Sequence, residues 1–316
     1  MLAASCVLAC APAALAQGQG FPNRPVKIIV PQTPGGASDA LARIVGQKLS
    51  ERWGQPVVIE NRAGAGGNIG MDAVAKAPGD GYTLLMSYVG SHAINPSIYK
   101  QLPFDPERDF VAVGTLANVP FVAAVNAKVP VGDAKALAAL AGQRPVAFGS
   151  AGNGSVNHLL GEMLNSTAGI DLQHVPYKGV APAMTDVIGG QVPMAFASLP
   201  SVLSHLKSGK LVALGVSSAQ RSPALPEVPA IAEKVPGYSG TLWVGLFAPR
   251  GIPTDVEARL QQALAKALAQ PETRAQLAAQ GVELAANGSA AALAALLQED
   301  LVRWARLVKS SGAQVD

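Results

Sequence analysis

The sequence is poor in cysteine and in charge. Its two cysteines, Cys6 and Cys10, lie within the first ten of 316 residues, so the chain beyond them has no cysteine nucleophile, disulfide or thiolate metal site. Charged residues make up 14% of the chain, and the net charge of +3 comes from scattered basic residues. A nucleic-acid partner, which requires a concentrated basic patch, is therefore not expected.

Charge is missing altogether from residues 1–20. The apolar run from Leu2 to Ala9 and the Ala14-Leu-Ala16 sequence are typical of a secretory signal peptide, although a basic N-terminal region is missing. The run is too short for a membrane anchor, which needs about 20 apolar residues. Residues 1–16 are therefore predicted to be a signal peptide, with export to the periplasm. Lipidation at Cys10 stays open as an alternative.

Motifs for metal binding, cofactors and catalysis are also lacking. The loop 149–155 has the glycine spacing of a nucleotide-binding loop but carries Ser155 where that motif needs lysine, and 64–70 does not meet the dinucleotide pattern. No serine nucleophile motif occurs. The histidines are too far apart in sequence for a metal motif: His92, His158, His174 and His205. We expect no cofactor, no metal and no catalytic residue. A hydrolase using a serine or histidine is the least favoured alternative.

What the sequence does contain is a regular alternation of strand-like and helix-like runs. Strands are expected at 26–30, 56–60, 82–86, 119–126, 146–149, 172–175, 194–197, 211–216 and 241–248. Helices are expected at 39–52, 69–76, 133–141, 155–168, 181–188, 201–207, 255–269 and 289–308. This order predicts an α/β fold with parallel strands joined by right-handed crossovers. The pattern restarts after Asn118, which indicates a second lobe, and the closing helices are expected to pack on the first.

Two glycine-rich loops, Pro31–Asp39 and Phe148–Ser155, each follow a strand-like run and lead into a helix-like one. Glycine lets the backbone approach a ligand, and the free amides and positive dipole end of the following helix attract an anion. Two such loops predict one anionic ligand held between two lobes.

Several side chains near these loops have two interpretations. Ser38 and Ser155 are suited either to capping the helix that follows or to touching the ligand. His158 lies one turn into the second helix and faces the ligand or packs in the core. Asp39 and Arg43 have the spacing of an ion pair on the surface of a helix.

Several further segments match a known family in order along residues 21–310. They are Pro31-x-x-Pro-Gly-Gly-x-Ser-Asp39, Val58-Ile-Glu-Asn61 with Gly64–Gly70, Asp80-Gly-Tyr-Thr-Leu-Leu85, His174-Val-Pro-Tyr-Lys-Gly179, Arg221–Pro229 and Trp243-x-Gly-Leu-x-Ala-Pro249. In these segments the chain resembles Bug-type (Bordetella uptake gene) extracytoplasmic receptors, the solute-binding proteins of tripartite tricarboxylate transporters.

The resemblance implies a type II-like periplasmic binding protein with two lobes, a cleft between them and a two-strand hinge. Lobe 1 would comprise 21–122 and 247–316, and lobe 2 would comprise 123–246. The implied partners of this monomer are a small carboxylate and the membrane permease subunits of the transporter. A periplasmic sensor with another signalling partner has the same fold and stays open.

Backbone amides and ordered waters would hold the ligand carboxylate in such a receptor. The matching positions here are Gly35, Gly36, Ala37, Ser38 and Asp39 of the first loop, and Ser150, Gly152, Asn153, Gly154, Ser155 and His158 of the second. Gln32 replaces an aromatic residue common in the family, and Ala197 stands where amino-acid-binding members carry Asp. A buried ammonium group without a carboxylate partner is costly, so an amino acid ligand is disfavoured. Mono-, di- and tricarboxylates and aromatic acids all stay open.

Overall fold

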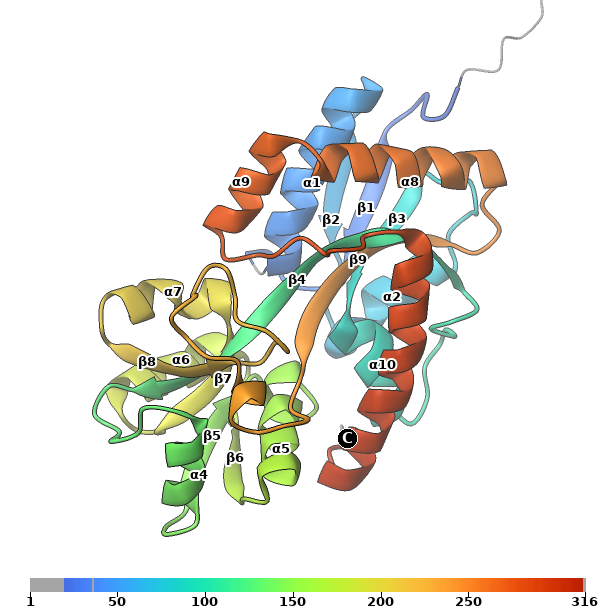
Figure 1. Ribbon diagram of the computed structural model, residues 1–316. Coiled ribbons are helices and arrows are strands. Elements are labelled where there is room, and N and C mark those ends of the chain that lie inside the picture. Colours follow the sequence, from blue (N-terminus) through green and yellow to red (C-terminus); the bar gives the residue numbers. More distant parts are fainter. Residues whose placement is uncertain (1–19, 36, 315–316) are drawn as a thin grey trace, which may run out of the picture.

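The computed structural model describes residues 20–35 and 37–314 and shows an α/β protein of two lobes (Figure 1). Within these residues, neighbouring strands follow the order β2-β1-β3-β9-β4-β7-β5-β6, and β8 also pairs with β4. The strands are β1 (Val26–Val30), β2 (Val57–Asn61), β3 (Thr83–Tyr88), β4 (Phe110–Asn126), β5 (Val146–Ser150), β6 (Leu172–Pro176), β7 (Met194–Ser198), β8 (Leu211–Val216) and β9 (Thr241–Pro249).

The α-helices are α1 (Ala37–Trp53), α2 (Asn68–Ala75), α3 (Asn95–Ile98), α4 (Ala134–Ala141), α5 (Val156–Ala168), α6 (Val180–Gly189), α7 (Leu199–Lys207), α8 (Thr254–Leu268), α9 (Pro271–Ala279) and α10 (Ala290–Ser311). Short turns of 3-10 helix lie at η1 (Ala65–Gly67) and η3 (Ile231–Glu233), and a π-helical turn at η2 (Gly90–Ile94). Every helix and strand expected from the sequence is present. The sequence pattern did not predict η2, α3, α9 or the first half of β4.

The parallel pairing expected from the alternation is confirmed within each lobe. Strand β1 lies between β2 and β3 in lobe 1, and β5 lies between β6 and β7 in lobe 2, all parallel. The remaining strands depart from this pattern, because β9 runs antiparallel to β3 and β4, and β4 runs antiparallel to β7 and β8. Hydrophobic runs reveal where strands are but not the direction in which they pair.

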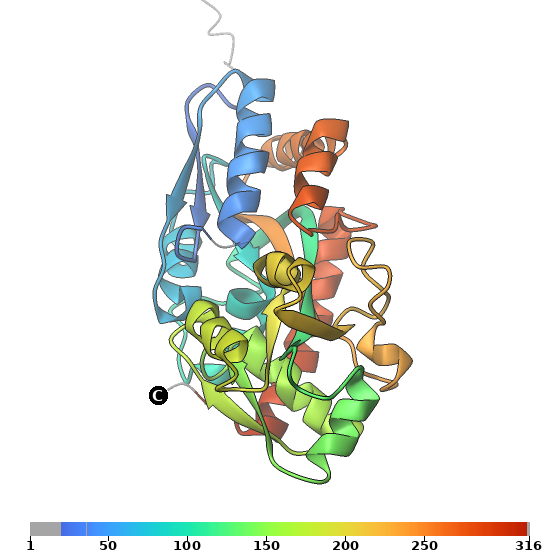
Figure 2. The ribbon, with the colours of Figure 1, turned by 90° about the vertical axis from the view of Figure 1, so that its left-hand side faces the viewer.

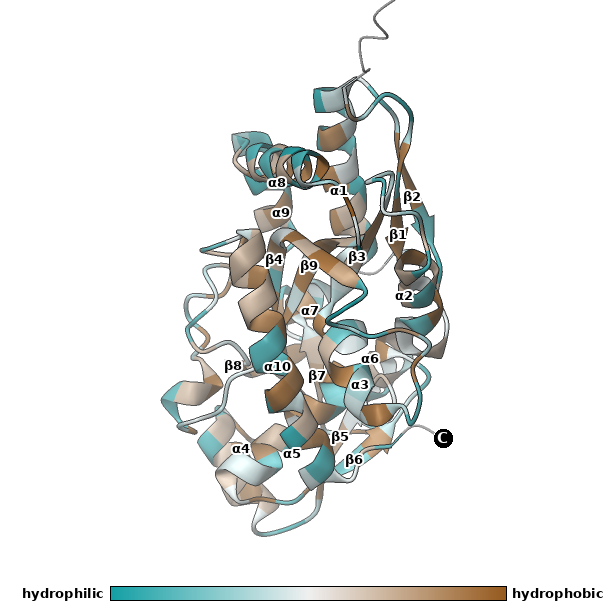
Figure 3. Cartoon of the chain, turned by 90° about the vertical axis from the view of Figure 1, so that its right-hand side faces the viewer, coloured by the Kyte–Doolittle hydropathy of each residue, from teal (hydrophilic) through white to brown (hydrophobic). Residues whose placement is uncertain are grey.

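Strand β4 is shared by both lobes. From Phe110 to Pro120 it pairs with β9, and from Phe121 onward it pairs with β7 on one side and β8 on the other. Strand β9 returns the chain alongside the first half of β4, so two neighbouring strands connect the lobes. Figure 3 shows hydrophobic residues along the strands, with hydrophilic residues more frequent on the helices around them.

The C-terminal helices pack differently from one another. Helices α8 and α9 pack against α1, as expected for a tail that returns to lobe 1 (Figure 2). Helix α10 also packs on β4 and η2, but it runs on to contact α5 of lobe 2 (Figure 1). The indole nitrogen of Trp243 in β9 donates to Asp300 Oδ2 on α10 at 2.7 Å, and Trp304 is buried further along the helix. Helices α8 and α9 therefore pack on lobe 1 as the sequence predicted, whereas the contact of α10 with lobe 2 was not predicted.

Trp304→Ala should lower the free energy of unfolding by about 3–5 kcal/mol, because it leaves a large cavity where α10 meets both lobes. Val302 on the same helix is 54% exposed, so Val302→Ala should change the free energy by less than about 0.5 kcal/mol. Urea unfolding followed by circular dichroism measures both. Equal effects of the two substitutions would contradict the packing described for α10.

Candidate functional site

A pocket of about 310 Å³ lies where the two lobes meet. Lobe 1 contributes Gln32, Gly66, Tyr88, Asn95, Ile98 and Tyr99, and lobe 2 contributes the segment from Asn153 to Asn157. Phe121 and Leu242 of the two connecting strands complete the wall between them. None of the described residues that line the pocket is charged. Any ion bound here would be held by dipoles and hydrogen bonds.

The second glycine loop forms the lobe 2 side of this pocket. Strand β5 ends at Ser150, and the chain then turns through Gly152 and Gly154, whose φ angles of 118° and 72° favour glycine. Ser155 caps the helix that follows, since its hydroxyl accepts a hydrogen bond from the His158 amide at 3.3 Å. The capping role is thus present, and Ser155 also lines the pocket.

Most amides within this loop already have partners in the protein. Gly152 N donates to Ser150 Oγ at 3.0 Å, Gly154 N to His158 Nδ1 at 3.1 Å, and Ser155 N to the Gly152 carbonyl at 3.2 Å. Among the described residues, the amides of Asn153, Val156 and Asn157 have no such partner. The last two belong to the first turn of the 13-residue helix α5, where amides are left free and the dipole is positive. The amides that remain free to bind a ligand therefore belong to residues near the glycines and not to the glycines themselves.

Ser150 and His158 lie on the interior side of the loop and accept hydrogen bonds from its backbone. Ser150 is 1% exposed and His158 is 6% exposed, and neither lines the pocket. Gly152 does not line the pocket either. Of the two interpretations of His158, the structure shows packing, with the ring bonded to the loop backbone.

The first glycine loop is braced by Asp39. This carboxylate accepts hydrogen bonds from Gly35 N at 3.0 Å, Asn61 Nδ2 at 3.1 Å and Arg43 Nη2 at 2.9 Å. Burial raises the pKa of Asp39, but the bonds from Arg43, Gly35 and Asn61 outweigh it and hold the pKa below its ordinary value. The ion pair of Asp39 with Arg43 that the spacing predicted is present, but the Asp39 side chain is buried and not at the surface.

Most of the first loop stands outside the pocket lining. Gln32 lines the pocket, and its buried Oε1 has no partner among the described residues. Gly35, Ala37, Ser38 and Asp39 do not line it, and Gly36 lies outside the described residues.

Lobe 1 instead presents a wall that the sequence did not predict. Asn95 Nδ2 donates to the Gly66 carbonyl at 3.0 Å and to Asn68 Oδ1 at 2.7 Å. A Cβ atom on Gly66 would lie 2.7 Å from the Tyr99 hydroxyl, so glycine is needed at this close approach. Tyr88 lies at the end of β3, just before the π-helical turn, a feature that is frequent at functional sites. That turn has no distinctive sequence pattern.

Ala197 lies in β7 opposite Val122, is fully buried and does not line the pocket. Within the described part of the chain, no carboxylate side chain replaces the one that is missing here, because neither Asp nor Glu lines the pocket. A ligand ammonium group would find no anionic partner in the lining.

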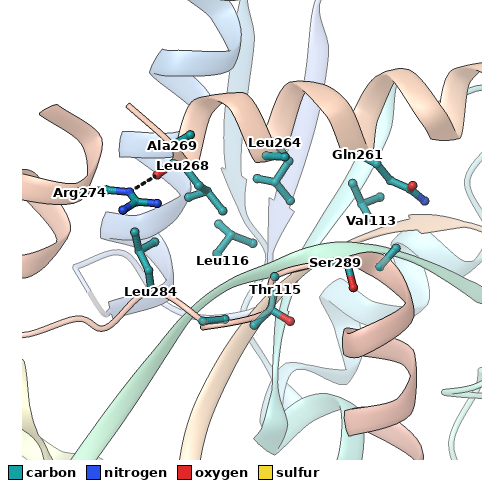
Figure 4. Close-up of a pocket in the computed structure, with 14 residues that line it drawn as sticks. Val113, Thr115, Leu116, Gln261, Leu264, Leu268, Ala269, Arg274, Leu284 and Ser289 are labelled. Carbon is teal, nitrogen blue, oxygen red and sulfur yellow. Dashed lines mark hydrogen bonds between the residues drawn. The ribbon is translucent and has the colours of Figure 1, made fainter. Parts of the chain in front are cut away.

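A second cavity, of about 380 Å³, lies between α8, β4 and the segment leading to α10 (Figure 4). Leu116, Leu264 and Leu268 give it a largely apolar wall, and Arg274 Nε donates to the Leu268 carbonyl at 3.3 Å. Neither glycine loop contributes to it.

The described part of the chain contains no group of side chains that could hold a metal ion. It also contains no helix that is both long and apolar enough to cross a membrane.

Comparison with known proteins shows which family has this sequence and this architecture. The sequence model described as the tripartite tricarboxylate transporter family receptor matches residues 41–313. The chain belongs to this family. It is 36% identical over 299 residues to the protein BugT of Bordetella pertussis, covering 93% of this chain and 91% of BugT. The Bug-type resemblance of the sequence motifs is thereby confirmed.

Two solved structures share the fold. The structure named R. palustris Rpa4515 with adipate has a TM-score of 0.84 and 36% identity, covering 93% of this chain and 100% of that one. MatC from Rhodopseudomonas palustris with bound malate has a TM-score of 0.79 and 32% identity, covering 91% of this chain and 100% of that one. The family consists of transporter receptors, and the two-lobe fold expected from the sequence is the fold of these relatives.

Asp39→Asn should destabilise the protein by about 1 kcal/mol at pH 7, because the charged acceptor of the hydrogen bonds from Gly35, Arg43 and Asn61 is lost. The folded pKa of Asp39 is lowered, so its stabilisation is present above the unfolded pKa of about 3.9 and is lost as the pH falls through the folded pKa. Thermal unfolding at pH 7 and pH 3 measures this difference. Glu227→Gln, an exposed control with the same charge change, should have little effect. A deficit as large at pH 3 as at pH 7 would exclude the ionised carboxylate as its cause.

Proposed function

We propose that this protein is a periplasmic receptor that captures a small carboxylate between its lobes and delivers it to the permease of a tripartite tricarboxylate transporter. The observation that carries the proposal is the set of uncommitted amides at the start of α5, which belong to residues lining the pocket between the lobes. Family membership and the bound adipate and malate of two relatives support the same ligand class.

The chemistry of the pocket suits a carboxylate. Backbone amides and a helix N-terminus offer several donors to one anion without a counter-charge. On the opposite wall, Gln32, Tyr88, Asn95 and Tyr99 offer neutral polar groups for the rest of the ligand. A volume of about 310 Å³ is at the small end of ligand pockets, which fits a short acid.

Release and capture would come from movement about β4 and β9. Lobe 1 at 21–122 with 247–316 and lobe 2 at 123–246 are proposed as the moving units. Ile98 of lobe 1 lies against Gly154 of lobe 2, where the side chain fills the space that a Cβ atom would need. Opening the lobes would part this contact and expose the free amides to solvent.

Catalysis is not part of the proposed function. Ser150 and His174 are within hydrogen-bond distance, the pairing that a hydrolase would use. The serine hydroxyl is buried and accepts a bond from the Gly152 amide, so it is not presented to the pocket.

The proposal also includes export directed by residues 1–16 and a monomeric state. Residues 1–16 lie outside the described part of the chain.

The test is isothermal titration calorimetry of the chain from Gln17 onward against malate, adipate, succinate, citrate, benzoate and nicotinate. At least one acid should bind, and a ligand at 100 times its dissociation constant should add about 2.7 kcal/mol of stability. If none of these acids binds to protein that has been unfolded and refolded to remove any retained ligand, the carboxylate proposal is wrong.

Asn153→Asp should weaken binding of the best acid at least about tenfold, because it places a like charge in the pocket with almost no change in shape. Asn287→Asp is the matched control. Asn287 is exposed, does not line the pocket, and uses Oδ1 to accept a bond from Ser289 N, which aspartate also provides. Calorimetry compares the two variants, and similar affinities would exclude Asn153 from the anion site.

A further inference from the structure

Two imidazole rings lie beneath the second glycine loop without lining the pocket. His158 on α5 and His174 on β6 stack with ring centroids 3.7 Å apart and an interplanar angle of 13°. Phe148 of β5 packs against both rings, at 6.4 and 5.2 Å. The pair is thus enclosed between the strands and the helix that carry the loop.

His158 is bonded to the loop through one nitrogen. Its Nδ1 accepts the hydrogen bond from Gly154 N, so this nitrogen carries no proton. In the neutral ring the proton must then be on Nε2, which lies 3.6 Å from Glu162 Oε1. A single tautomer of His158 therefore serves the loop on one side and faces a carboxylate on the other.

His174 reaches the loop through Ser150. Gly152 N donates to Ser150 Oγ, and Ser150 Oγ lies 2.5 Å from His174 Nε2. The Ser150 hydroxyl has a second acceptor in the Gly152 carbonyl at 3.2 Å, which also accepts the Ser155 hydroxyl at 2.7 Å, so the contact with His174 is the shorter of the two. Burial lowers the pKa of His174 to about 4, reinforced by His158 and partly opposed by Glu162, so its Nε2 is free to accept.

We propose that His158 and His174 are positioning residues that hold the second loop in its anion-binding conformation only while both rings are neutral. Each fixes one loop glycine, and the free amides of Asn153, Val156 and Asn157 lie next to the two positions so fixed. Carboxylate affinity then falls when either ring is protonated. This inference rests on the proposed function, because it concerns the affinity of the same site.

Protonation has two opposing effects. A proton on His158 Nδ1 would face the Gly154 N–H with a second donor, and two stacked cations 3.7 Å apart would repel. A positive ring near the site would, in contrast, attract an anion. The groups that face the rings are Glu162 on α5, and Phe148 and Ser150 on β5. Glu162 alone is charged among these and offsets part of the positive charge. Because neither ring lines the pocket, we expect the loss of the loop bonds to outweigh the remaining attraction for the anion.

The experiment replaces each ring in two ways and measures binding of the tightest acid of the panel at pH 7.5. His158→Phe and His174→Phe keep an aromatic ring but remove the acceptor. His158→Asn and His174→Gln place an amide oxygen near the lost Nδ1 and Nε2, and do not titrate. The Phe variants should bind about tenfold more weakly, equivalent to one hydrogen bond, and the amide variants within about threefold of the wild type. His205→Asn on α7 is the control.

A pH series from 7.5 to 4, which reaches the pKa of His174, supplies the second readout. The affinity ratio of the wild type to the double variant His158→Asn with His174→Gln cancels protonation of the ligand itself. This ratio should fall as the pH approaches 4, because only the wild type can charge His174. A ratio that is constant or rises, or Phe variants that bind as tightly as the wild type, would overturn the positioning role.

Nitrogen NMR of the imidazole rings tests the positioning role without relying on ligand binding, so that its failure can be told apart from failure of the proposed function. In the ligand-free wild type, His158 should be protonated on Nε2 and bare on Nδ1, and the Phe variants should shift or broaden the Gly152 and Gly154 amides. If the wild type binds no acid, the proposed function is refuted. The positioning claim is refuted separately if His158 shows the other tautomer or those amides are unmoved.

Discussion

Strand β4 is the element on which the rest of the structure depends. It pairs with β9 in lobe 1 and with β7 and β8 in lobe 2, so one continuous backbone carries both halves of the sheet. The pocket lies where β4 changes partners, with Phe121 at that point and Leu242 of β9 beside it. Ligand sites in open α/β sheets form at the carboxyl ends of strands, and the β5 loop reaches the pocket from such an end.

The site that this arrangement creates is polar but uncharged. A buried lysine or arginine would give stronger attraction to an anion but would carry a desolvation cost whenever the ligand leaves. Free amides at the start of a helix would avoid that cost, because they would be solvated in the open form of the proposed receptor. A receptor that must both capture and release its ligand benefits from this balance.

The two glycine loops share one structural device. In each, a glycine amide donates to a side chain four residues later in the first turn of the following helix: Gly35 to Asp39, and Gly154 to His158. The first acceptor is a charged carboxylate tied to Arg43, and the second is a neutral imidazole stacked on another. These two glycine amides are therefore satisfied within the protein, and in the second loop it is neighbouring amides that remain free at the pocket.

Periodicity, glycine patterns and short motifs are local, so the residues alone were enough to predict the alternating elements, the two glycine loops, the Asp39–Arg43 pair and the family. The sequence also identified Gln32, Asn153, Gly154 and Ser155, which line the pocket. The folded chain was needed to show that Tyr88, Asn95 and Tyr99 form the opposite wall, that Ala197 is buried in the core, and that His174 stacks on His158. These facts depend on strand direction and on contacts between distant segments, which no local pattern encodes.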